Sequence, residues 1–62
     1  MTQEDKDKSE AMRGYNSKSV VITLDSIYKR YTGTTLGNKC NCSKNNRIEK
    51  IKKYYEWYEE NN

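Results

Sequence analysis

The longest uninterrupted apolar run in this chain is only three residues, Val20-Val21-Ile22, and this scarcity of apolar residues limits the fold more than any other feature. Hydrophobic residues fill 32% of the 62 positions. A chain of this length forms at most one small domain, which is marginally stable unless a disulfide, a metal or a partner chain supports it. The run is also too short for a membrane span or a signal peptide. We therefore expect a protein that is not secreted and has no membrane partner.

The N-terminal residues 1–18 are mostly charged or small, and apart from Met1 their only large apolar side chains are Met12 and Tyr15. So little apolar surface does not offset the entropy lost when a segment becomes ordered. The sequence therefore predicts an extended or disordered N-terminal arm over 1–18, either mobile or bound to a partner, and a small structured unit over 19–62.

Two segments of that unit have helical periodicity. In the first, Leu24, Ile27, Tyr28 and Tyr31 share one face, which predicts a helix over about 23–32 with Thr23 as N-cap and Gly33 as its end. Residues 20–22 are expected to form an extended segment leading into this helix. An alternative is that residues 20–25 add as an edge strand to the sheet of another protein.

The second helix is predicted over about 43–60, with Ser43 as its N-cap. Its apolar face spans roughly 120° and consists of Ile48, Ile51, Tyr54, Tyr55 and Tyr58. Trp57 is expected outside this face, beside Lys50 and Lys53. The predicted fold class is thus mainly α, with two short helices that face each other as in a hairpin and are joined by a Cys-containing loop.

The loop holds the only two cysteines, Cys40 and Cys42. A structural zinc site needs four ligands, and the chain supplies two thiols and no histidine. These cysteines could therefore bind metal only if the site were shared between chains. A disulfide is disfavoured because the residues are two positions apart and because a protein that is not exported meets a reducing environment. We expect two small side chains packed under the loop, and no cofactor.

Positive charge is concentrated around this loop. Residues 34–53 contain six basic residues and one acidic residue, Glu49, giving +5. With Lys50, Lys53 and Trp57 on one edge of the second helix, this segment could contact phosphates and stack on a base. A lysine-rich helix face is more commonly a solvated surface, so nucleic-acid binding is the weaker alternative to binding a protein.

Catalysis has little support in the sequence. The chain has no histidine, no glycine-rich phosphate loop, and no base suitably paired with a serine or cysteine. We therefore expect a non-enzyme. Tyrosine and tryptophan are common where a surface meets a partner, and the predicted partner-binding residues are Tyr54, Trp57, Tyr58, Lys50 and Lys53.

Residues 24–62 resemble small uncharacterised proteins of tailed bacteriophages that infect Bacteroides-like hosts, including crAss-like phages. The matching motifs are Ile27-Tyr28, Thr32-Gly33, Cys40-Asn41-Cys42 and Arg47. The resemblance implies a capsid-associated accessory protein, located in the virion or in the cytoplasm of the bacterial host. The alternatives are an inhibitor or regulator of a host protein and a nucleic-acid-binding accessory protein.

Overall fold

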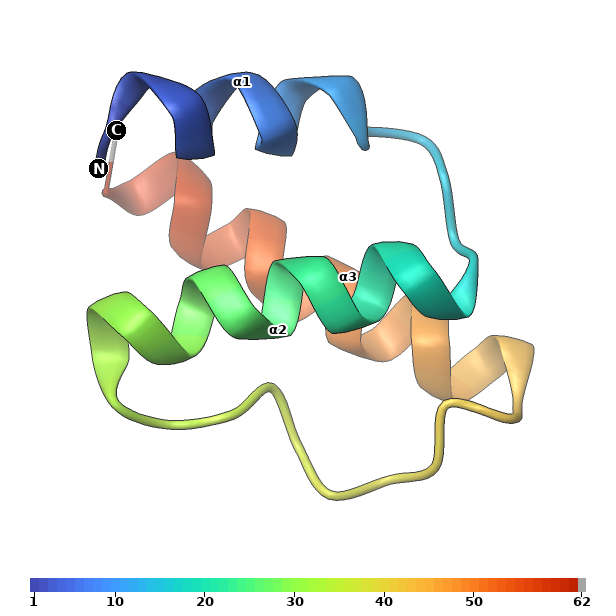
Figure 1. Ribbon diagram of the computed structural model, residues 1–62. Helices are drawn as coiled ribbons and strands as arrows, with labels where there is room; N and C mark the ends of the chain where they lie inside the picture. Colours follow the sequence, from blue (N-terminus) through green and yellow to red (C-terminus); the bar gives the residue numbers. More distant parts are fainter. Residues whose placement is uncertain (62) are drawn as a thin grey trace.

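Residues 1–61 are described by a computed structural model, and they form three helices: α1 (Gln3–Ala11), α2 (Lys18–Thr32) and α3 (Lys44–Glu60) (Figure 1). No strand occurs in this range, so the predicted mainly helical fold is confirmed, but with three helices in place of two. The limits of α3 agree with the prediction. Gly33 ends α2 in the left-handed conformation, with φ of 80°.

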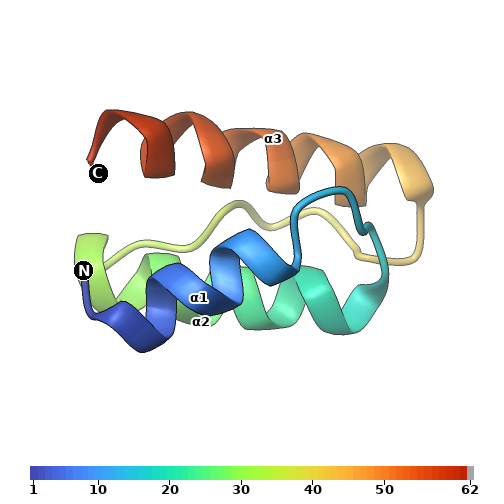
Figure 2. The ribbon, with the colours of Figure 1, turned by 90° about the horizontal axis from the view of Figure 1, so that it is seen from above.

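The prediction was wrong about the direction of the second predicted helix relative to the first. Both α2 and α3 begin at the same end of the molecule and run the same way, while α1 runs in the opposite direction (Figures 1 and 2). Residues 33–43 therefore cross back along the molecule. This loop can span the length of α2 with fewer residues, because an extended chain covers about 3.3 Å per residue and a helix only about 1.5 Å.

The start of α2 also differs from the prediction. Ser17 is the N-cap, and its hydroxyl accepts a hydrogen bond from the Val20 amide at 3.3 Å. Residues 20–22 are helical, which excludes both the extended lead-in and the edge strand for this structure, and Thr23 lies inside the helix. The reason is periodicity: Val21 is three positions before Leu24 on the same helical face, and both side chains are buried.

The apolar core lies between α2, α3 and the loop of residues 33–43, which we call the crossover loop. Its cluster of buried residues, each at most 5% exposed, consists of Leu24, Ile27, Leu36, Tyr54 and Tyr58. Leu36 anchors the loop, and its backbone amide donates to the carboxylate of Asp25 at 2.8 Å. The loop is thus held by its own chain.

The predicted disordered arm is wrong for residues 3–11, which form α1 and lie against the other helices. Asp5 and Ser9, one helical turn apart, are buried at 2% and 0% exposure. Asp5 accepts hydrogen bonds from Arg30 at 2.8 Å and from the Tyr31 hydroxyl at 2.5 Å. Ser9 shares a hydrogen bond with the Tyr54 hydroxyl. Reasoning from apolar content missed α1 because its contacts are polar.

The dimensions of the molecule agree with an ordered N-terminal segment. The radius of gyration is 10.6 Å, and a folded chain of this length is expected to have about 10.6 Å. Arg13 also fastens the end of α1 to α3, because its guanidinium binds Glu59 at 2.8 Å and lies 4.7 Å from the centre of the Tyr55 ring. The first 18 residues are therefore part of the folded unit.

Replacing Gly33 by alanine is expected to lower the free energy of unfolding by about 1 kcal/mol. No atom lies within 4 Å of the position that a Cβ would take, so the cost comes from the positive φ alone. Urea unfolding followed by circular dichroism measures it. Gly33→Asn should cost less, because asparagine tolerates this conformation better. Equal losses for the two variants would contradict this explanation.

Candidate functional site

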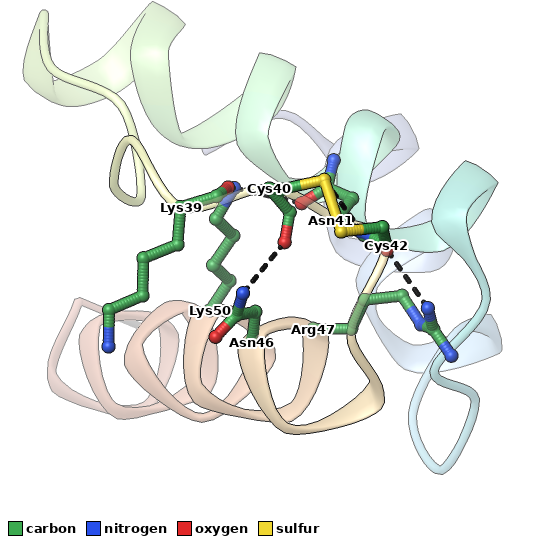
Figure 3. The surroundings of a disulfide bond; sticks show 7 residues. All are labelled: Lys39, Cys40, Asn41, Cys42, Asn46, Arg47 and Lys50. Atoms are coloured by element: carbon green, nitrogen blue, oxygen red, sulfur yellow. Dashed lines mark hydrogen bonds between the residues drawn. A yellow bond between two sulfur atoms is a disulfide. The ribbon is translucent and has the colours of Figure 1, made fainter.

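The loop that carries the cysteines is fixed to the first half of α3 by side chains that donate to its backbone (Figure 3). Asn46 donates to the carbonyl of Cys40 at 3.0 Å, and Arg47 donates to the carbonyl of Asn41 at 2.9 Å. Arg47 also donates to the carbonyl of Asn16 at 2.8 Å, in the connection between α1 and α2. The Arg47 guanidinium thus links both the α1–α2 connection and the cysteine loop to α3.

Cys40 and Cys42 form a disulfide (Figure 3), contrary to the sequence-based expectation of two free thiols. Their Cα atoms are 5.3 Å apart, within the usual range for a disulfide, because the loop turns sharply at Asn41. The amide of Cys42 donates to the sulfur of Cys40, closing the turn. In this state neither sulfur is a thiolate, the form that binds zinc.

Lys50 is buried, although the sequence placed it on an exposed edge. Only 8% of it is exposed, and its ammonium group donates to the carbonyl of Lys39 at 2.6 Å and to the side-chain oxygen of Asn41 at 2.8 Å. The side chain reaches from α3 to the loop (Figure 3). Its aliphatic part is packed while the charged end binds loop oxygens.

A pocket of about 280 Å³ lies beside Lys50, between loop residues 36–39 and the α3 residues Glu49, Lys50 and Lys53. Lys39 forms an ion pair with Glu49 at 3.0 Å, and both side chains are more than half exposed. The structure thus brings the predicted residues Lys50 and Lys53 together at one site, although it buries the first of them.

Trp57 is half-buried rather than outside the packed face. Its ring lies 5.2 Å from that of Tyr28 and 5.5 Å from that of Tyr54, measured between ring centres. The ammonium of Lys53 lies 5.9 Å from the centre of the Tyr28 ring. A second pocket, of about 210 Å³, leaves Trp57 accessible beside Met1, Tyr31 and Asn61. Lys53 and Trp57 are therefore the predicted binding residues that still reach the surface.

Tyr54 and Tyr58, also predicted to bind a partner, are core residues in this structure. Tyr54 is fully buried and Tyr58 is 5% exposed. Burial raises the pKa of Tyr58 to about 12, and the neighbouring Glu10 carboxylate acts in the same direction. Neither ring is available at the surface of the folded chain.

We call residues 14–22 and 41–48 the basic end, because they contain the connection before α2 and the starts of α2 and α3, which lie at one end of the molecule. Their basic residues are Lys18, Lys44 and Arg47, and their exposed large apolar residues are Tyr15, Ile22 and Ile48. These three apolar residues are 65%, 58% and 42% exposed respectively. The connection before α2 and the starts of α2 and α3 lie together there in both views (Figures 1 and 2). Sequence reasoning missed it because it assigned Ile22 and Ile48 to packed segments.

The charged side chains of the basic end are all positive. Residues 14–22 and 41–48 contain Lys18, Lys44 and Arg47 and no acidic residue, which gives +3. The positive ends of the α2 and α3 macrodipoles add to this charge. A partner for this end would need acidic groups interspersed with apolar ones.

The described residues offer no obvious metal centre. No group of three or more histidine, cysteine, aspartate or glutamate side chains within residues 1–61 is arranged to hold a metal ion. None of the three helices in this range is long and apolar enough to cross a membrane. Comparisons with protein-family models, curated proteins and solved structures gave no match to this chain.

Proposed function

We propose that this chain is a small non-enzymatic interaction protein that binds an acidic, partly apolar surface of a partner protein through its basic end. The observation that carries the proposal is the exposure of Tyr15, Ile22 and Ile48 in two segments whose charged residues are all basic. Exposed apolar residues next to charge of one sign are typical of a protein-binding surface. The folded chain presents this surface on ordered helix starts, so little ordering entropy is lost on binding.

The proposed partner is a component of a tailed-phage particle, with this chain as a capsid-associated accessory protein in the virion. The sequence resemblance to small phage proteins supports this assignment. Regulation of a host protein would use the same surface but would leave the chain in the cytoplasm of the bacterial host. The two roles therefore differ in location and not in the binding chemistry.

Replacing both Tyr15 and Ile48 by serine is expected to lower the amount of this protein in purified particles at least about tenfold, because two exposed apolar contacts are lost. Quantitative mass spectrometry, relative to the major capsid protein, measures it. The control variant Lys29→Ser/Lys52→Ser removes two exposed cations outside the basic end and should be retained.

Absence of the wild-type protein from particles would contradict the virion assignment and favour the role of regulator. Oligonucleotide binding with an affinity that falls linearly in log salt concentration would favour the nucleic-acid alternative. In that case removal of Lys18 or Lys44 would reduce the salt slope, whereas Ile48→Ser would leave it unchanged.

A further inference from the structure

The pocket between the crossover loop and α3 contains a buried cation whose hydrogen-bonding capacity is only partly used. A lysine ammonium has three N–H donors. Those of Lys50 have two acceptors, the Lys39 carbonyl and the Asn41 side-chain oxygen. No third acceptor is present among residues 1–61. Lys50 is 92% buried and lines the pocket, so a ligand in the pocket would lie beside this side chain.

The charge of the pocket is also not balanced by its own residues. The ion pair between Lys39 and Glu49 cancels one positive charge against the single acidic group of the lining. Lys50 and Lys53 form no ion pair within the described residues, which leaves two positive charges beside the pocket. A buried charge is stabilised by an opposite charge that accepts its hydrogen bond.

We propose that this pocket binds a carboxylate, with one oxygen accepting the third hydrogen bond of Lys50 and Lys53 supplying a second positive charge at the rim. The volume of about 280 Å³ is slightly below the range of about 300–1,000 Å³ found for sites of drug-sized ligands. It therefore suits a small organic acid or one carboxylate of a partner protein. Leu36 and the lysine stems form apolar walls for the body of such a ligand.

The carboxylate is favoured over phosphate by the donors that the pocket provides. A phosphate dianion has three oxygens to satisfy, and arginine forks or several backbone amides match them better than a lysine, which acts as a point charge. This pocket has lysines alone as its basic residues, and one of their charges is already paired with Glu49. The site shares no residue with the basic end, so its test is independent of the proposed function.

The test is a titration of the ¹⁵N-labelled full chain at fixed ionic strength, followed by amide NMR shifts. The probes are benzoate, a capped tripeptide with one glutamate, inorganic phosphate, and chloride as reference. Saturable shifts confined to residues 36–41 and 49–53 are expected with benzoate, the tripeptide or both, and not with phosphate. Binding of benzoate indicates a free acid as ligand, and binding of the tripeptide alone indicates a partner protein.

Variants identify the groups responsible. Lys53→Gln should weaken binding about three- to five-fold, as expected for a partly exposed charge. Lys52 is exposed and directly precedes Lys53 on α3, so Lys52→Gln should leave the affinity unchanged. Lys50→Met should weaken binding at least about tenfold, because a charge-assisted hydrogen bond is lost. If Lys50→Met disturbs the loop, the comparison of the variants at 52 and 53 decides the question.

Three results would overturn the proposal. The first is amide shifts that grow linearly with concentration for every probe. The second is an equal loss of binding affinity in Lys52→Gln and Lys53→Gln. The third is phosphate binding as tight as that of the carboxylates.

Discussion

Replacing Tyr54 by alanine is expected to remove about 3–5 kcal/mol from the free energy of unfolding, the usual cost of truncating a buried aromatic residue. A chain of 62 residues has about 3–9 kcal/mol in total, so much of the variant should be unfolded at 37 °C. Tyr54 is fully buried, and its ring lies 5.2–6.0 Å from those of Tyr55, Trp57 and Tyr58. Urea unfolding followed by Trp57 fluorescence and circular dichroism measures the loss.

Tyr54→Phe is the matched control, because it keeps the ring and removes only the hydroxyl. Ser9 then loses its bond to Tyr54 but still donates to the carbonyl of Asp5 at 2.8 Å. The expected cost is therefore about 1 kcal/mol, the net value of one hydrogen bond. If phenylalanine cost as much as alanine, the hydroxyl and not the packed ring would be what Tyr54 contributes.

The part of the fold that sequence periodicity predicted is the part held by apolar contacts. Tyr54 and Tyr58 of α3, and Leu24 and Ile27 of α2, were assigned to the packed faces and are buried. Gly33 ends α2 as expected because only its own backbone conformation is involved. The relative direction of α2 and α3 was not predictable, because a loop of this length permits either a hairpin or a crossover.

The first helix was missed because the residues that attach it are polar and their partners are distant in sequence. Asp5 binds Arg30, 25 positions away, and Ser9 binds Tyr54, 45 positions away. A buried aspartate and a buried serine produce no apolar periodicity. Only a fold already known would indicate that this carboxylate has a guanidinium and a phenol beside it.

The candidate sites were predictable in composition but not in geometry. The sequence drew attention to Lys50, Lys53 and Trp57, and the first two of these line the pocket. Lysine is usually exposed, so the burial of Lys50 was unexpected. It follows from loop oxygens at Lys39 and Asn41, whose position depends on the turn at the cysteines.

Replacing Asp5 by asparagine is expected to lower the free energy of unfolding at pH 7 by about 2 kcal/mol, within the range for hydrogen bonds to a charged group. The lower part of that range is appropriate because Arg30 is 58% exposed and its ion pair is weakened by solvent. The loss should be concentrated in α1. Hydrogen exchange of the amides of residues 3–11 should accelerate more than that of α3, which locates the effect.

Asp5→Asn should also remove the part of the pH dependence of the unfolding free energy that comes from this carboxylate. The hydrogen bond from Tyr31, together with Arg30 and Thr2, lowers the pKa of Asp5 from its ordinary value of 3.8, although burial acts against this. A carboxyl group with a lowered pKa in the folded state stabilises the fold above its unfolded pKa. That contribution is lost as the pH falls below about 3.8 and through the folded-state value. Wild type should therefore lose more stability than Asp5→Asn between pH 5 and the lowest pH at which it folds.

Asp7→Asn is the control for this experiment, because Asp7 is on the same helix but exposed, and within residues 1–61 its side chain bonds only Gln3, at the surface. It should retain both the stability at pH 7 and the acid dependence of wild type. Glu10, whose pKa Arg13 lowers, contributes acid dependence to all three proteins, so the difference between wild type and Asp5→Asn is the quantity to compare. An acid loss in Asp5→Asn as large as that of wild type would show that the carboxylate of Asp5 does not hold α1 in place. The attachment would then rest on the Ser9 hydroxyl, which bonds Tyr54, and on the Ser9 backbone carbonyl, which accepts from the Tyr55 hydroxyl. Ser9→Ala removes only the first of these bonds, so the double variant Ser9→Ala/Tyr55→Phe would be needed to release the helix.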